Sequence, residues 1–487
     1  MRLRALFAST VLLLAGCATE ANPVGTLEPG EEPQTQAVEW SDCDGGFECA
    51  DVAAPLNWLQ AGEEYVSIRL MRKAGTNQLP AMLINPGGPG ASTTDWMRGG
   101  YDTIGTSWLR QNFQLVAFDP RGVGESTAVV CSDDQLKDQL LYGQSEFEYG
   151  SEEDLSYSKD LMLRFAESCQ LDGPSPAYFN TQQTARDMEL IRELLGEELL
   201  NYLGFSYGTE LGATYAALFP ERVGKFVLDG AVDPELDSSS QLLGQVRGFD
   251  KALRAYLADC LGATYCPFNG SVDDAMRRIS GFLLARETSP LETDFEGREL
   301  GIQGAIYGIL VTLYSQGSWQ YLSQAFDEAF YGDGTLMLML ADFYNDRENE
   351  GGYLTNVNEA NFAINCADAR LKDAGDDLDQ EILEASIVWG KYFSTPDISC
   401  TGWPDGIGME TLDFDVELAN QPIIIGTTGD PATPYEQAVS LANLLDGKLL
   451  TLRGEGHTAY GDNGCIDSLV DAYLAGEDLG EGSLTCF

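Results

Sequence analysis

Three short apolar segments of this chain each run directly into a turn that is rich in glycine or opens with an acidic residue. Apolar runs of this length, bounded by turns, are typical of strands that are buried on both faces of a parallel sheet. They restrict the fold more strongly than any other pattern in the sequence. The segments are Ala81–Ile84, Phe113–Phe118 and Leu199–Leu203.

Helical patterns lie between these segments, and further strand candidates follow them. Residues 184–195 and 209–219 have helical patterns, and additional strands are expected at Lys225–Leu228 and Pro422–Ile425. The alternation predicts an α/β protein with a mostly parallel sheet. In such sheets, ligand chemistry takes place at the carboxyl ends of the strands.

The middle of the chain has a different character. Between about Asp237 and Asp405 the strand-like runs fade, and aromatic-rich helical segments such as Gln241–Leu261 and Gly317–Phe330 take over. We expect a mainly helical insertion there, with the sheet pattern resuming near Leu412. The predicted organisation is an export signal at 1–17, a disordered tether at 18–40, the first part of the α/β core at 41–236, the helical insertion at 237–405 and the second part of the core at 406–487.

The amino terminus has the features of an export signal. Arg2 and Arg4 precede an apolar run, Ala5–Ala15, that is too short to span a bilayer comfortably. The run leads into Leu-Ala-Gly-Cys17, which resembles a bacterial lipobox, where Cys17 would carry the lipid; the alternative is an ordinary secretory signal. We expect an exported protein that is lipid-anchored to the outer face of the cytoplasmic membrane or released, with membrane contact through the lipid alone.

The other ten of the eleven cysteines form an even set, which in an exported protein favours up to five disulfides. Connectivity cannot be deduced from the sequence, but spacing suggests a pairing. A zinc site is disfavoured because the chain has one histidine and no Cys-x2-Cys pair, so no metal is expected. The suggested pairs are Cys43–Cys49, Cys131–Cys169, Cys260–Cys266, Cys366–Cys400 and Cys465–Cys486.

The chain is strongly acidic, with 77 acidic and 28 basic residues and a formal net charge of −49. Such a surface repels nucleic acids and anionic lipid headgroups, so neither is expected as a ligand. The charge can also concentrate cationic substrates near a cleft, for example peptides with a free amino terminus. The alternative interpretation of most of these residues is a solvated acidic surface.

The sequence Gly204-Phe205-Ser206-Tyr207-Gly208 fits the nucleophile-elbow pattern Gly-x-Ser-x-Gly. The pattern requires a strained turn between a strand and a helix, which lifts the serine hydroxyl above the sheet. By itself the pattern is weak. An apolar strand precedes it and a helix of small residues follows it, and this context makes Ser206 a candidate nucleophile.

A serine hydroxyl is a poor nucleophile unless a base removes its proton, and His457 is the only histidine of the chain. Its unperturbed pKa is about 6.5, which suits proton transfer near neutral pH. Asp430 follows the strand candidate at Pro422–Ile425, with room for one helix and one strand before His457. The order Ser206, Asp430, His457 is that of a hydrolase triad; the alternative role of Asp430 is an N-cap before a helix that starts with proline.

Acyl transfer also needs hydrogen-bond donors for the developing oxyanion. The backbone N–H of Tyr207, directly after the nucleophile, is one candidate. The loop Gly87-Gly88-Pro89-Gly90 after the first strand offers the second, with Gly88 as the expected donor. The alternative is a plain glycine turn.

Several segments spread along the chain resemble the secreted bacterial tripeptidyl aminopeptidases, which are proline iminopeptidase-like serine peptidases of the α/β-hydrolase superfamily. One departure is Pro86, where the related iminopeptidases carry a histidine, although the secreted branch shares the proline. The matching segments are 85–92, 119–126, 204–209, 228–234, 363–368, 400–404 and 454–457.

The resemblance implies an α/β-hydrolase fold with a large helical cap, inserted before the strand that carries the catalytic acid. It implies a serine exopeptidase that releases short pieces from free amino termini of peptides. We also expect that the protein needs no cofactor and is monomeric. Carboxylates of the cap would bind the substrate amine, and Glu359 and Asp368 are the candidates. The alternative for Asp368 is a structural role beside a disulfide.

Four further charged residues of the matching segments are assigned structural roles. Asp119 and Arg121 are expected to stabilise a loop, and Asp229 and Asp233 to serve structure or a hinge of the cap. Two other functions stay open: an esterase or amidase of small substrates on the same fold, and a peptide-binding lipoprotein without catalysis.

Overall fold

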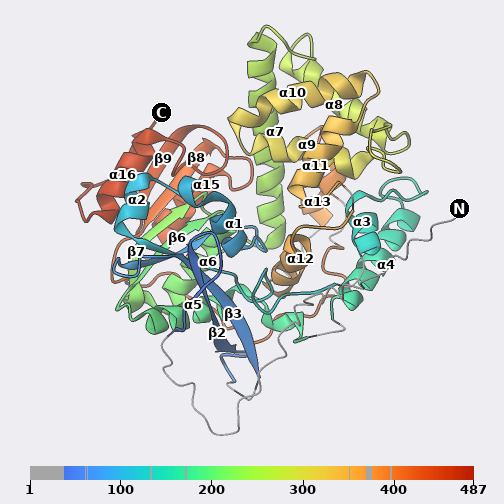
Figure 1. The fold of residues 1–487 in the computed structure, drawn as a ribbon. Helices are drawn as coiled ribbons and strands as arrows, with labels where there is room; N and C mark the ends of the chain where they lie inside the picture. Colours follow the sequence, from blue (N-terminus) through green and yellow to red (C-terminus); the bar gives the residue numbers. More distant parts are fainter. Residues whose placement is uncertain are drawn as a thin grey trace, which may run out of the picture.

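The computed structural model describes residues 38–487 except 61, 63, 132–133, 171–172, 350, 369–375 and 395–397. Its centre is a ten-stranded sheet in the order β1-β2-β3-β5-β4-β6-β7-β8-β9-β10 (Figure 1). The strands are β1 (Ser41–Asp42), β2 (Phe47–Pro55), β3 (Tyr65–Lys73), β4 (Ala81–Asn85), β5 (Gln114–Phe118), β6 (Leu200–Phe205), β7 (Val223–Asp229), β8 (Ile423–Gly429), β9 (Lys448–Glu455) and β10 (Leu484–Cys486).

The strands from β5 to β10 in this order are parallel, and β1, β2 and β3 add an antiparallel edge. All five strands expected from the apolar segments are present, and β4 and β5 are buried throughout. β2 and β3 instead alternate between buried and more exposed residues, as expected where one sheet face meets water. A search for continuous apolar runs therefore overlooks them.

Helices cover both faces of the sheet (Figure 1). One face packs against α1 (Thr93–Gly100), α2 (Ser107–Asn112) and α16 (Gly464–Leu474), which contribute Met97, Leu109 and Ile466 to one buried cluster. The other face packs against α5 (Thr181–Leu195), α6 (Tyr207–Leu218) and α15 (Tyr435–Leu444). The predicted α/β class with a mostly parallel sheet is confirmed.

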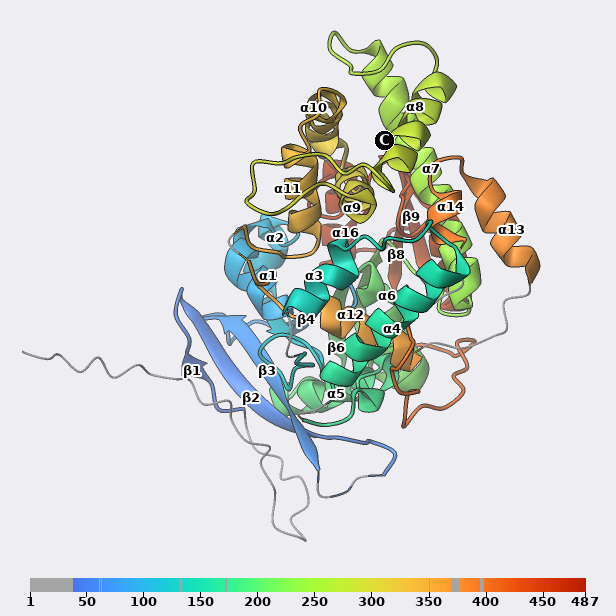
Figure 2. The same cartoon turned by 90° about the vertical axis from the view of Figure 1, so that its right-hand side faces the viewer.

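The predicted insertion is a helical cap with a hydrophobic core of its own (Figures 1 and 2). Trp389 and Phe326 are fully buried there. Regular sheet structure resumes at Ile423, so the expectation of Leu412 is wrong: Trp403 and Phe414 pack into the core from extended chain without joining a strand. The cap helices are α7 (Ser238–Gly262), α8 (Val272–Arg286), α9 (Ile302–Leu313), α10 (Trp319–Phe330), α11 (Thr335–Tyr344), α13 (Asp376–Ala385) and α14 (Gly390–Phe393).

One helix of the insertion, α12 (Val357–Asp368), packs with the sheet cluster through Ala360, Ala363 and Ile364. Two helices that precede the insertion, α3 (Asp134–Tyr142) and α4 (Glu152–Ser168), lie beside α12 in both views (Figures 1 and 2). α3 is tied to the cap by the Asp138–Arg347 ion pair and by a hydrogen bond from the Tyr142 hydroxyl to the Ala341 carbonyl. The cover over the sheet therefore comes from two parts of the chain.

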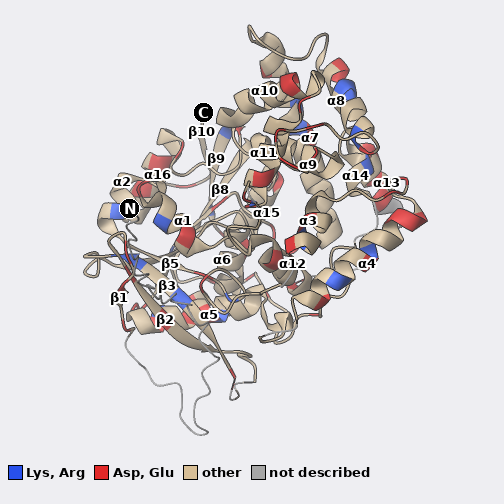
Figure 3. Ribbon diagram, turned by 45° about the vertical axis from the view of Figure 1, so that its right-hand side comes forward, with Lys and Arg blue, Asp and Glu red and all other residues tan. Residues whose placement is uncertain are grey.

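All five suggested disulfides are present: Cys43–Cys49, Cys131–Cys169, Cys260–Cys266, Cys366–Cys400 and Cys465–Cys486. Cys17 and the expected signal and most of the tether lie outside the described residues. Within the described part of the chain, no helix has the length and apolar character needed to cross a membrane. Acidic residues are distributed over the sheet side and the cap alike (Figure 3).

Candidate active site

Ser206 occupies the turn between β6 and α6 in a backbone conformation that is unusual for a residue with a side chain, at φ 55° and ψ −125°. The neighbouring glycines make the turn possible. A Cβ at Gly204 would clash with the carbonyl oxygen of Gly208, and one at Gly208 would lie 2.9 Å from the carbonyl oxygen of Asn85. The Ser206 hydroxyl does not cap α6, which leaves it available for chemistry.

Backbone contacts hold this turn in place. The Ser206 N–H donates to the carbonyl oxygen of Asp229 at the end of β7, at 2.9 Å. The Ser206 carbonyl accepts both the amide and the hydroxyl of Thr209, at 2.8 and 2.6 Å. The strain at Ser206 is therefore fixed by its surroundings, as is typical of functional turns.

His457 lies in the loop after β9, and its Nδ1 is 2.9 and 2.8 Å from Oδ1 and Oδ2 of Asp430. Its Nε2 is buried and has no hydrogen-bond partner among the described residues. Burial lowers the pKa of His457, but the charge and hydrogen bond of Asp430, with a further contribution from Asp229, raise it, and the net pKa shift is upward. This is the arrangement of a base whose tautomer a carboxylate fixes.

Asp430 follows β8 directly and its side chain is fully buried. Its Oδ1 accepts the amides of Ala432 and Thr433, each at 2.9 Å, and its Oδ2 accepts the Thr433 hydroxyl at 3.0 Å. The alternative role of Asp430, an N-cap, is not found: α15 begins at Tyr435 with Pro434 before it, and the carboxylate closes the preceding turn instead. The helix and strand expected between Asp430 and His457 are α15 and β9.

The two candidate oxyanion donors, Gly88 and Tyr207, line the same cavity as Ser206. Tyr207 is the first residue of α6, so its N–H has no partner within the helix. A Cβ at Gly87 would lie 2.9 Å from Cβ of Ser206 and 3.2 Å from the nitrogen of Tyr207, so the glycine loop packs closely on the elbow. Gly88, Ser206 and Tyr207 line one common cavity.

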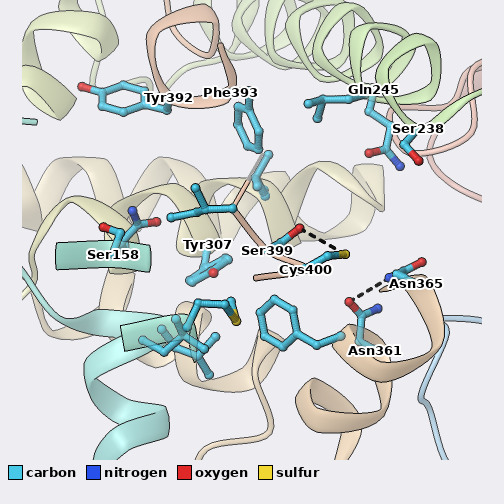
Figure 4. Close-up of a pocket in the computed structure, with 18 of the residues that line it drawn as sticks. Ser158, Ser238, Gln245, Tyr307, Asn361, Asn365, Tyr392, Phe393, Ser399 and Cys400 are labelled. Atoms are coloured by element: carbon cyan, nitrogen blue, oxygen red, sulfur yellow. Dashed lines mark hydrogen bonds between the residues drawn. The ribbon is translucent and has the colours of Figure 1, made fainter. Parts of the chain in front are cut away.

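That cavity has a volume of about 770 Å³ and lies between the sheet and its helical cover. Figure 4 shows Tyr392 and Phe393 of α14 and Gln245 of α7 on one side, with Asn361 and Asn365 of α12 opposite. The described lining residues include no Lys, Arg or His. Four of the described lining residues are carboxylates: Asp154, Glu210, Asp368 and Glu287, the last ion-paired with Lys391.

The two predicted amine-binding residues have different surroundings. Asp368 lines the cavity, and its carboxylate accepts the amide and the hydroxyl of Thr181 at 2.9 and 2.6 Å, so it is also a structural residue at the start of α5. Glu359 is buried, ion-paired with Lys137 at 2.5 Å, and is not among the lining residues. The expectation for Glu359 is therefore corrected: its partner is the Lys137 ammonium, not a substrate.

Asp119 and Arg121, which were predicted to stabilise a loop, both make buried structural contacts. Asp119 accepts the amides of Thr94 and Glu125, at 3.0 and 2.9 Å. Arg121 forms a buried ion pair with Asp187 at 2.6 Å. Both stabilise loops, as predicted, and neither lines the cavity.

Asp233 accepts the amide of Glu235 and stays structural, but Asp229 contacts the loop of His457. Sequence reasoning also missed two neighbours of the base, Thr433 and Tyr314. Thr433 Oγ1 is 3.3 Å from Nδ1 of His457, and a hydroxyl three residues after an aspartate is a recognisable turn signal. The carbonyl of Tyr314, at the end of α9, accepts the His457 amide at 2.8 Å, and no sequence pattern marks that contact.

The chain matches the model of the α/β-hydrolase fold over residues 80–464, which is most of its length. It belongs to the α/β-hydrolase family. Serine protease Hip1 of Mycobacterium tuberculosis (strain ATCC 25618 / H37Rv) is 32% identical over 499 residues, covering 97% of this chain and 95% of the relative. Carboxylesterase B of the same strain is 32% identical over 504 residues, covering 98% and 96%.

Tripeptidyl aminopeptidase of Streptomyces lividans is 27% identical over 478 residues, covering 92% of this chain and 86% of the relative. The resemblance drawn from the sequence segments is thus confirmed at the level of the family. The family and these relatives together support a serine hydrolase.

Proposed function

We propose that the protein is a serine exopeptidase that cleaves short peptides near their free amino terminus through an acyl-enzyme. The observation that carries the proposal is the only histidine of the chain, which is hydrogen-bonded to buried Asp430 and whose buried Nε2 has no hydrogen-bond partner in the described part of the chain. Ser206, on its strained turn, lines the acidic cavity beside this loop. Ser206, His457 and Asp430 are therefore proposed as the nucleophile, the base and the carboxylate that orients the base.

In the proposed reaction, Ser206 Oγ attacks the scissile carbonyl carbon while its proton passes to Nε2 of His457. Asp430 keeps the other ring proton on Nδ1 and stabilises the imidazolium. The amides of Gly88 and Tyr207 donate to the carbonyl oxygen as it becomes negative. The imidazolium then protonates the leaving amine, and water repeats the sequence on the acyl-enzyme.

The charge of the cavity supports a substrate with a cationic end. Asp368 and Glu210 both line it, and the charge of each acts on the phenol of Tyr207, directly after the nucleophile. An ammonium group held there would place only the first few residues of a peptide between the amine site and Ser206.

A second candidate, an esterase or amidase of small substrates, is supported by the similarity to carboxylesterase B. The two are separated by kcat/KM on a ladder of free and acetylated peptides and on short-chain aryl esters, with Ser206→Ala as the inactive control. The exopeptidase proposal expects cleavage a fixed number of residues from a free amine and strong loss on acetylation. Equal cleavage of acetylated peptides would contradict it, and activity restricted to esters would favour the second candidate.

Amine binding by Asp368 is tested by Asp368→Asn against the control Asp259→Asn, which removes an exposed carboxylate of α7 that does not line the cavity. We expect Asp368→Asn to raise KM for free peptides by about tenfold, which corresponds to about 1.4 kcal/mol, with little effect on acetylated ones. If kcat/KM falls equally for free and for acetylated peptides, Asp368 has a structural role only.

We further propose export with a lipid on Cys17. The five disulfides support an oxidising compartment. Mass spectrometry of the mature amino terminus tests this proposal. A diacylated Cys17 and recovery in the membrane fraction are expected, and an unmodified Cys17 in a mature chain would contradict the lipid anchor.

A further inference from the structure

Asp229, the last residue of β7, is fully buried, and its side chain contacts the loop that carries His457. Its Oδ2 accepts the amides of Ala459 and Tyr460, at 2.9 and 2.7 Å. These amides belong to the second and third residues after the histidine. A carboxylate from a neighbouring strand therefore fixes the backbone of this loop immediately beyond the imidazole.

The loop needs such a fixing point. Thr458, directly after His457, has φ 67°, in the left-handed region that a β-branched residue rarely adopts. Conformations of this kind persist only where the surrounding contacts impose them. The two hydrogen bonds to Asp229 act on the residues that follow Thr458 and hold the loop in this strained form.

The same residue also holds the nucleophile. The carbonyl oxygen of Asp229 accepts the Ser206 amide at 2.9 Å. The next residue, Gly230, lies so close to the imidazole that a Cβ there would be 3.0 Å from Cε1 of His457. Asp229 thus links the Ser206 turn to the His457 loop through one short piece of chain.

The carboxylate of Asp229 is also an electrostatic neighbour of the base. Its Oδ1 is buried without a hydrogen-bond partner among the described residues. Burial raises the pKa of Asp229 to about 6, although the amides of Tyr460 and Ala459 and the charge of His457 oppose this. The ionisable groups that shift the pKa of His457 are Asp430 and Asp229.

We propose that Asp229 is a second anionic positioning residue for His457: its carboxylate fixes the strained loop, and its charge stabilises the protonated imidazole. The inference rests on the proposed role of Ser206 and His457. When the serine proton moves from Oγ to Nε2 and the Oγ–carbon bond forms, a positive charge appears on the ring. Asp430 stabilises this positive charge by direct contact with the ring, and the buried carboxylate of Asp229 stabilises it without direct contact. The charge disappears when Nε2 gives the proton to the leaving group.

Asp229→Asn separates the two effects, because the amide oxygen can still accept both loop amides while the charge is lost. The single histidine makes the imidazole NMR signal unambiguous in the full-length protein. We expect the pKa of His457 to fall, because the Asp229 charge that raises it is lost, and kcat to fall about tenfold with KM unchanged. Asp229→Ala, which removes the acceptors as well, should lower kcat further.

Asp119→Asn is the matched control, since Asp119 is also a buried carboxylate that accepts two backbone amides, from Thr94 at the start of α1 and from Glu125. It should lower the melting temperature without moving the pKa of His457. An unchanged His457 pKa in folded Asp229→Asn would overturn the inference. If that variant does not fold, the wild-type amide signals of Ala459 and Tyr460 decide: they should shift as Asp229 titrates, and signals that do not respond would overturn it.

Labelling of wild-type Ser206 by a fluorophosphonate distinguishes this inference from the proposed function. Absence of labelling would overturn the catalytic role of Ser206 itself. Labelling at the normal rate together with an unmoved His457 pKa in Asp229→Asn would overturn the role of Asp229 alone.

Discussion

The contacts of Asp430 predict what Asp430→Asn will do to the base. Oδ1 accepts two backbone amides, from Ala432 and Thr433, and only an oxygen can fill that position. The new NH2 group of asparagine must therefore occupy the position of Oδ2, which is 2.8 Å from Nδ1 of His457. There it can donate a hydrogen bond to Nδ1 and so favours the tautomer with the ring proton on Nε2, while Oδ1, 2.9 Å from Nδ1, is already occupied by two backbone amides.

An imidazole with its proton on Nε2 cannot accept the proton of Ser206. We expect kcat to fall by about 10⁴-fold, which corresponds to about 5.4 kcal/mol of transition-state stabilisation. The fold should survive, because asparagine keeps the Oδ1 acceptor of the two backbone amides, and only the Thr433 hydroxyl, which Oδ2 accepts in the wild type, must reorient. The melting temperature should therefore change far less than the activity.

Two measurements test this reasoning. Steady-state kinetics on a peptide substrate, normalised to folded protein, gives the loss in kcat. Nitrogen-resolved NMR of the single histidine reports the tautomer, with the proton on Nδ1 in the wild type and on Nε2 in Asp430→Asn. A variant within tenfold of wild type, or one that keeps the Nδ1 proton, would refute the assignment of Asp430.

Three further results are expected. His457→Ala should lower kcat/KM by about 10⁴-fold or more at unchanged circular dichroism, since the chain has no other histidine; wild-type activity would contradict the triad. Gly204→Ala should cost about 3 kcal/mol or prevent folding, because the new Cβ meets the backbone oxygen of Gly208, and a normal melting temperature would contradict this packing. Burial raises the pKa of Asp229 from 3.8 to about 6, so the folded state keeps the Asp229 proton over a pH range where the unfolded state has lost it. This difference stabilises the folded protein fully below about pH 3.8, and the stabilisation is lost as the pH rises to 6. Relative to Asp229→Asn, denaturant titrations of the wild type should therefore lose about 3 kcal/mol between pH 3.5 and 7.5, and a constant difference would contradict the raised pKa.

The sequence predicts well those parts of the structure where one local pattern determines the outcome. The strand ending at Phe205 is buried on both faces and leads into a glycine-bounded turn, so both the strand and Ser206 can be located from a few neighbouring residues. The position of Asp430 follows in the same way from the apolar strand before it. His457 needed no pattern, because it is the only histidine.

Contacts between distant segments could not be predicted in this way. The family resemblance favours Glu359 as an amine-binding residue because it flanks a matching segment of the cap, but its partner Lys137 is far away in sequence. Asp229 has an ordinary strand-end sequence, and its contacts with Ala459 and Tyr460 depend on how β7 and the loop after β9 meet at one edge of the sheet. Such pairings depend on topology, which local periodicity does not contain.

Residues of the cap and residues at the strand ends of the sheet both contact His457, from different sides. From the sheet side, Asp430 holds Nδ1 and Asp229 holds the loop beyond the ring. From the cap side, the Tyr314 carbonyl accepts the His457 amide at 2.8 Å, and the Tyr314 ring meets the imidazole edge-on at 5.4 Å between centroids. Tyr314 also lines the cavity, so one cap residue contacts both the base and the space for substrate. The helical insertion therefore belongs to the structure that positions the base, in addition to enclosing the cavity.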